Sequence, residues 1–107
     1  MTQDEINEVA MQMILHAGNG RNLIKEALEK MDEDYFAEGE EQLKEAKKEL
    51  NLAHNAQTKV VQYSMENPVE INLLFTHAQD TLMTILSEYN IAKQLFKLYY
   101  KISKIGG

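Results

Sequence analysis

The chain has 107 residues, with 17 Asp and Glu against 11 Lys and Arg, and its formal net charge at pH 7 is −6. This length suits one domain with a buried core, so we predict a single domain over residues 1–107. The acidic charge disfavours nucleic acids as partners because their phosphates would be repelled, and the absence of cysteine excludes disulfides, thiolate zinc sites and cysteine nucleophiles.

Apolar and small residues spaced alternately four and three positions apart mark the first predicted helix, because this spacing places them on one helix face. They are Ile6, Ala10, Met13, Ala17, Gly20, Ile24, Ala27 and Met31. The register passes unchanged through Gly18 and Gly20, although an interior glycine costs a helix about 1 kcal/mol relative to alanine. We predict one continuous helix. The alternative, two short helices joined by a glycine turn, would ordinarily break the register.

A second helix of about thirty residues is predicted from a second stripe with the same spacing. Its members are Phe36, Gly39, Leu43, Ala46, Leu50, Ala53, Gln57, Val60 and Ser64. Asp32 or Asp34 is predicted to cap its start, because a carboxylate oxygen can accept hydrogen bonds from the first free backbone N–H groups.

The third helix is predicted to start in the segment ENPVE, residues 66–70. Asn67 suits the N-cap, Pro68 the first helical position, and Glu70 can complete a capping box. The seam that follows contains Ile71, Phe75, Ala78, Leu82, Ile85, Tyr89, Ala92, Phe96 and Tyr99. Three helices of about 30 residues with no strand pattern predict an all-α, antiparallel up-down-up three-helix bundle.

A second row on the third helix, about 140° around from the seam, predicts self-association. The row has apolar ends and a polar middle: Leu73, His77, Asp80, Thr84, Ser87 and Ile91. A single copy has no further helix to cover this row, so we expect contact between copies of the chain. The spacing alone does not choose between two, three or four copies.

Asp80 lies in this row, where a lone buried carboxylate would cost several kcal/mol. Copies related by an axis through the row would bring several carboxylates together, and a divalent cation such as Mg²⁺ could neutralise them. The alternative is that Asp80 lies just outside the contact and is solvated.

Three histidines are candidates for chemistry. His77 projects from the same side of the helix as Asp80, and a neutral imidazole can accept and release a phosphoryl group near pH 7. A hydrogen-bonded structural role is the alternative. His16 and His54 flank the first two seams and are interpreted as structural or surface residues. No H-E-x-x-H motif supports a zinc protease, and no phosphate-binding glycine loop supports use of a nucleoside triphosphate.

Three segments together resemble the lactose/cellobiose-type enzyme IIA family of the sugar phosphotransferase system. Residues 73–84, LLFTHAQDTLMT, resemble the family signature H-A-Q-D-H-L-M-T, and the resemblance extends over nearly the whole chain. Residues 18–21, GNGR, resemble the family's G-x-A-R or G-N-G-R segment, and residues 53–58, AHNAQT, resemble its A-H-x-x-Q-T segment. Residues 14–21 are more similar to the cellobiose than to the lactose members.

The resemblance implies a homotrimer of three-helix bundles and a role as a phosphocarrier in sugar uptake. His77 would accept phosphate on Nε2 from the carrier protein HPr and pass it to a cysteine of the IIB subunit. Asp80 of three chains would share one Mg²⁺ on the trimer axis, with Gln79 beside it. The membrane would be reached only through the IIC transporter. Because residues 4 and 5 are acidic and no apolar run approaches the roughly 18 residues that span a bilayer, we expect a cytoplasmic protein.

One departure from the family pattern is Thr81, which stands where many members have a second histidine. It puts in doubt the hydrogen bonding of the site and not the phosphorylated position. No basic residue adjoins His77, so a cation near the phosphate must come from elsewhere, and Arg21 is a candidate. Two alternatives stay open: a two-component histidine-phosphotransfer domain, and an adaptor bundle in which the polar row only fixes the oligomer register.

Overall fold

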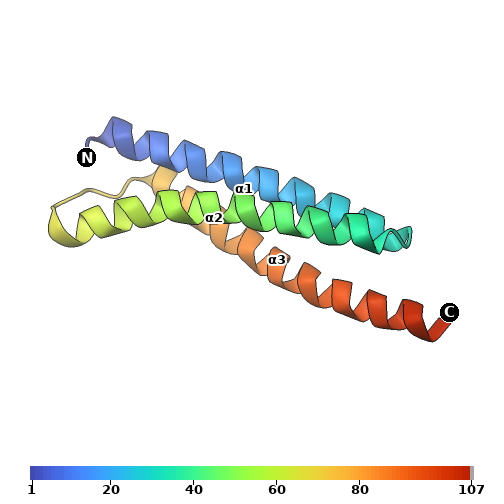
Figure 1. Ribbon diagram of the computed structural model, residues 1–107. Coiled ribbons are helices and arrows are strands. Elements are labelled where there is room, and N and C mark those ends of the chain that lie inside the picture. Colours follow the sequence, from blue (N-terminus) through green and yellow to red (C-terminus); the bar gives the residue numbers. More distant parts are fainter. Residues whose placement is uncertain (107) are drawn as a thin grey trace.

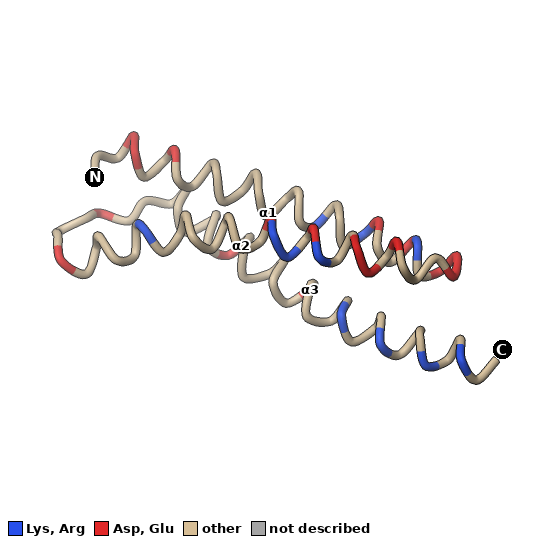
Figure 2. Tube along the Cα trace, viewed as in Figure 1, with Lys and Arg blue, Asp and Glu red and all other residues tan. Residues whose placement is uncertain are grey.

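The computed structural model describes residues 1–106, which form three helices: α1 (Gln3–Asp32), α2 (Phe36–Glu66) and α3 (Leu73–Gly106). α1 and α2 make an antiparallel hairpin, and α3 runs back antiparallel to α2 (Figure 1 and Figure 2). The molecule is elongated, with extents of 59 × 19 × 18 Å. Residues 1–106 contain no strand, so the predicted all-α, up-down-up three-helix bundle is confirmed. None of these helices combines the length and the apolar character needed to cross a membrane.

The predicted seams form the core. All eight stripe residues of α1 are buried, from Ile6 to Met31. In α2 the stripe is buried from Gly39 to Val60 except for the half-buried Gln57. In α3 it is buried from Phe75 to Ala92, whereas Ile71 and Tyr99, predicted at the two ends of this seam, are exposed. Periodicity therefore identified the buried faces, because burial follows the 3.6-residue turn wherever a helix packs on its neighbours along one side.

α1 is continuous through its two glycines, as predicted, and Gly20 has a packing reason. A Cβ atom at Gly20 would lie 3.0 Å from Leu50 Cδ2, so the missing side chain lets α1 and α2 approach closely there. Gly18 has no such neighbour, because a Cβ at that position meets nothing within 4 Å. Close packing of α1 on α2 therefore depends on Gly20 and on the fully buried Leu50 opposite it.

We expect Leu50→Ala to lower the free energy of unfolding by about 2–5 kcal/mol, because the truncation leaves a cavity against Gly20 that the helices cannot close. Leu52→Ala is the matched control: Leu52 is 49% exposed, and its truncation should cost less than about 1 kcal/mol. Urea denaturation followed by circular dichroism measures both. Equal losses for the two variants would contradict this account of the core.

The helix starts differ from the predictions in two places. Neither Asp32 nor Asp34 caps α2: the N-cap residue is Tyr35, with no side-chain cap, and Asp34 adopts a left-handed backbone with φ 66° in the turn. Tyr35 N–H donates to Lys30 O at 2.8 Å, which closes the end of α1. The turn geometry, not a carboxylate cap, thus sets where α2 begins.

The predicted start of α3 is also wrong. Asn67 ends α2 instead, because both its backbone N–H and its side-chain amide donate to Tyr63 O, at 3.0 and 3.2 Å. An extended connector follows, and the side chain of Asn72 caps α3 by accepting from Phe75 N–H at 2.8 Å. α3 therefore begins at Leu73 rather than Pro68. His77 consequently becomes the fifth residue of the helix.

Candidate functional site

The second row of α3 is uncovered in the single chain. All six of its residues are exposed, and its apolar ends, Leu73 and Ile91, are 85% and 61% exposed. Met83, beside the row, is 61% exposed. No helix in residues 1–106 packs on this face, so it is open to contact with a further chain.

His77 is exposed near the N-terminal end of α3, and no hydrogen bond or ion pair engages its imidazole within residues 1–106. Its carbonyl oxygen accepts a hydrogen bond from Thr81 Oγ1 at 2.8 Å, so the Thr81 side chain is bonded to the helix backbone. Helical side chains lean toward the helix N-terminus, which carries a partial positive charge. A negative group on the imidazole would therefore lie over the favourable end of the helix.

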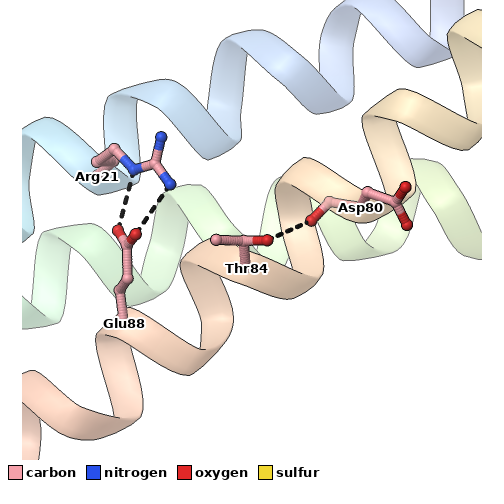
Figure 3. Close-up of polar contacts among 4 residues, drawn as sticks. All are labelled: Arg21, Asp80, Thr84 and Glu88. Carbon is pink, nitrogen blue, oxygen red and sulfur yellow. Dashed lines mark hydrogen bonds and ion pairs between the residues drawn. The ribbon is translucent and has the colours of Figure 1, made fainter.

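Asp80 is exposed one turn further along α3, and its carboxylate makes no hydrogen bond or ion pair with another residue of the 1–106 segment. Figure 3 shows its side chain directed away from the helix, while Thr84 Oγ1 donates to its backbone oxygen at 2.8 Å. The described residues of one chain bring no three His, Asp or Glu side chains together as a metal site. The free carboxylate fits a hard cation, but further ligands would have to come from other copies.

Arg21 does not serve His77 in this chain. Its Nε and Nη2 donate to the two carboxylate oxygens of Glu88, each at 2.9 Å, which ties α1 to α3 (Figure 3). Hydrogen bonding to Glu88 raises the pKa of the Arg21 guanidinium, which therefore stays charged. Glu88 follows His77 by eleven residues, about 16 Å along the helix. Arg21, the cation that the sequence suggested for His77, is thus bound in an ion pair three helical turns away from it.

The other two histidines lie outside this site. His16 Nδ1 lies 2.6 Å from Glu49 Oε2, and the half-buried pair links α1 to α2, in agreement with a structural role. His54 is exposed on α2, and its backbone oxygen accepts from Thr58 Oγ1 at 3.0 Å. Gln79, predicted beside Asp80, is half-buried.

Sequence reasoning missed Asn72, whose side chain fixes the start of the helix that carries His77. A signal was present, because an asparagine directly before the apolar run of residues 73–75 is itself an N-cap pattern. The capping-box sequence at residues 67–70 is a stronger start signal, and it led to the earlier start being predicted. The structure also shows an unpredicted capping box at α1, where Thr2 and Glu5 bond reciprocally. Hydrogen bonds from Thr2 lower the pKa of Glu5 below its ordinary value of 4.5.

The chain is similar to IIA proteins of the PTS system in its sequence. The family model described as the lactose/cellobiose-specific IIA subunit of the PTS system matches residues 8–100. The lichenan-specific phosphotransferase enzyme IIA component of Bacillus subtilis (strain 168) is 34% identical over 105 residues, covering 97% of this chain and 96% of that protein.

Two solved structures are similar along nearly the whole chain. The PTS cellobiose-specific enzyme IIA from Bacillus anthracis superposes with a TM-score of 0.86 and 33% identity, covering 97% of this chain and 94% of the other. A chain in the solution structures of the IIA(chitobiose)–HPr complex of Escherichia coli has a TM-score of 0.79 and 28% identity, covering 92% and 96%.

Proposed function

Because this chain belongs to the lactose/cellobiose-specific IIA family of the sugar phosphotransferase system, we propose that Nε2 of His77 is the atom that carries its phosphoryl group. The chain is a phosphotransferase component, which accepts phosphate from HPr and passes it to the IIB subunit. The observation that carries the assignment to His77 is its position near the start of α3, within the run HAQDTLMT, where its imidazole is exposed and has no partner among residues 1–106. His16 is already paired with Glu49.

The transfer needs a neutral imidazole and an in-line approach. The lone pair of Nε2 attacks the phosphorus of phospho-HPr, and the bond between phosphorus and the donor nitrogen breaks as the bond to Nε2 forms. In the second transfer the sulfur of the IIB cysteine attacks the same phosphorus, and the electron pair returns to Nε2. Positioning and electrostatics supply the catalysis.

The N-terminal end of α3 supplies part of this electrostatic help. His77 is only the fifth residue of the helix, so a phosphoryl group on Nε2 lies over the first turn and its partial positive charge. Had α3 begun at Pro68, His77 would be the tenth residue, beyond the range at which the helix end acts strongly. The late start of α3 therefore favours a phosphorylated His77.

We further propose that three chains associate through the second row of α3 as a homotrimer. The uncovered row supports this, since apolar Leu73, Met83 and Ile91 would leave water on association. In that assembly one Asp80 from each chain would hold a shared Mg²⁺, and the cation would offset the repulsion between the three carboxylates. The Asp80 carboxylate, which has no partner in the described part of the chain, supports the proposal.

The sugar is proposed to be a β-linked oligosaccharide of the cellobiose type, with a lactose-type sugar as the second candidate. Identity of 33–34% to a lichenan-specific and a cellobiose-specific IIA protein supports the first. We propose that the chain works in the cytoplasm and meets the membrane only through the IIC transporter. Growth of a deletion strain on cellobiose, lichenan-derived sugars or lactose would assign the substrate.

One experiment separates this function from that of a two-component phosphotransfer domain. The purified chain is incubated with phosphoenolpyruvate, enzyme I and HPr, and its intact mass is measured. We expect one added phosphoryl group per chain, and none when HPr is omitted. Phosphorylation by a histidine kinase but not by HPr would overturn the proposal.

A further inference from the structure

Asn72 holds the first turn of α3 through both its side chain and its backbone oxygen. Its Oδ1 accepts from Phe75 N–H at 2.8 Å, and its backbone oxygen accepts from Thr76 N–H at 3.1 Å and from Thr76 Oγ1 at 3.2 Å. These bonds fix the two residues that directly precede His77. The orientation of the helix beneath the imidazole therefore depends on Asn72.

The same side chain ties α3 to the start of α1. Its Nδ2 donates to Gln3 Oε1 at 2.9 Å and to Asn7 Oδ1 at 2.7 Å. Gln3 Nε2 in turn donates to the backbone oxygen of Glu70 at 2.8 Å, which holds the connector before Asn72. The acceptor atom of Asn72 thus caps α3, while its donor atom fixes that cap against a second helix.

This arrangement also decides between two possible starts of the helix. The segment at residues 67–70 carries a capping-box sequence with a proline at the first helical position. A helix that began there would run on into α3. In the structure those residues form the connector instead. The bonds of Asn72 to α1 oppose the earlier start, because they require the backbone at residue 72 to stay outside the helix.

We infer that Asn72 is a positioning residue for phosphoryl transfer at His77, acting through the first turn of α3 and its attachment to Gln3 and Asn7. This inference rests on the proposed role of His77. In-line transfer tolerates errors of only about 0.5 Å and 10–20° in the reacting groups. A first turn that frays or shifts its start would move the imidazole and also remove the helix end from beneath the phosphoryl group.

The test compares three variants at a temperature where all are fully folded. Asn72→Ala removes the cap and the attachment, whereas Asn72→Asp keeps an acceptor for Phe75 N–H and removes both donors. Asn67→Ala is the matched control, because it removes a similar side-chain bond at the end of α2 without touching α3. Initial rates of phosphorylation are measured over a range of phospho-HPr concentrations, and the exchange of the Phe75 and Thr76 amides is followed by NMR.

For Asn72→Ala we expect kcat to fall about tenfold with KM nearly unchanged, and the two amides to exchange about tenfold faster. The kcat of Asn72→Asp should be at least about threefold higher than that of Asn72→Ala. The kcat of Asn67→Ala should match that of the wild type within about twofold. The inference is overturned if Asn72→Ala keeps the wild-type kcat, if Asn67→Ala loses as much, or if the amide exchange does not change. A wild type that takes no phosphate would refute the role of His77 instead, and the exchange result would still decide whether Asn72 sets the first turn.

Discussion

We expect His77→Ala to take up no phosphate from phospho-HPr, whereas the wild type should gain one phosphoryl group per chain. The imidazole supplies the only atom of this chain that bonds to phosphorus in the proposed transfer, so its removal should reduce phosphorylation to background. The intact mass after incubation with phosphoenolpyruvate, enzyme I and HPr reports the result directly. Circular dichroism should be unchanged, because His77 is exposed and its side chain makes no hydrogen bond or ion pair among residues 1–106.

The matched control for this experiment is His54→Ala, since His54 is also an exposed helical histidine. It should accept phosphate at the wild-type rate. His16→Ala should do the same, with a small loss of stability because Glu49 loses its partner. Phosphate on His77→Ala at the wild-type level, or its loss in His54→Ala, would show that another residue carries the group.

The second large effect is expected at Asp80. The wild type should sediment as a trimer. At a Mg²⁺ concentration one hundred times the dissociation constant of Mg²⁺, the cation should stabilise this trimer by about 2.7 kcal/mol, and EDTA should reverse the effect. Asp80→Asn should remove this response, because a neutral amide neither repels its symmetry mates nor binds the cation strongly. Sedimentation and thermal melting with MgCl₂ or EDTA provide the measurement.

Asp4→Asn serves as the control, because it also removes one exposed carboxylate but lies in the first turn of α1. It should retain the response to Mg²⁺. The axial carboxylate site would be ruled out if Mg²⁺ did not change the melting temperature of the wild type. It would also be ruled out if Asp80→Asn responded to Mg²⁺ as strongly as the wild type. A wild type that sediments as a monomer would also remove the proposed trimer.

The helices and their buried faces could be predicted because a long amphipathic pattern has few interpretations. The eight residues predicted on the first helix are the eight that are buried there. Helix starts were less predictable, because several nearby polar residues can cap and tertiary contacts choose among them. Asn67 has the stronger local signal for α3, but Gln3 and Asn7 bond to Asn72, and those partners lie more than sixty positions away in the sequence.

In the candidate site, too, some features could be predicted from helical spacing and others depend on contacts between distant residues. The row containing His77 and Asp80 followed from helical spacing, and the structure confirms that it is uncovered. The roles of the two residues came from the family resemblance and stay predictions, as do the trimer and its cation. The Arg21–Glu88 pair could not be foreseen, because nothing local in the sequence indicates which acidic residue of α3 lies opposite α1.

The bonds from Asn72 to α1 also mean that the end of the molecule that carries His77 is completed by contacts between distant segments of the chain. The α1–α2 hairpin can assemble from neighbouring segments, whereas the contacts of Gln3 and Asn7 with Asn72 join residues 69 and 65 positions apart. Contacts of such separation cost more loop-closure entropy than local contacts, so we expect them to form after the α1–α2 hairpin. A chain still being synthesised, or one with α3 undocked, would therefore lack an ordered first turn beneath His77, and phosphate acceptance would report completion of the fold.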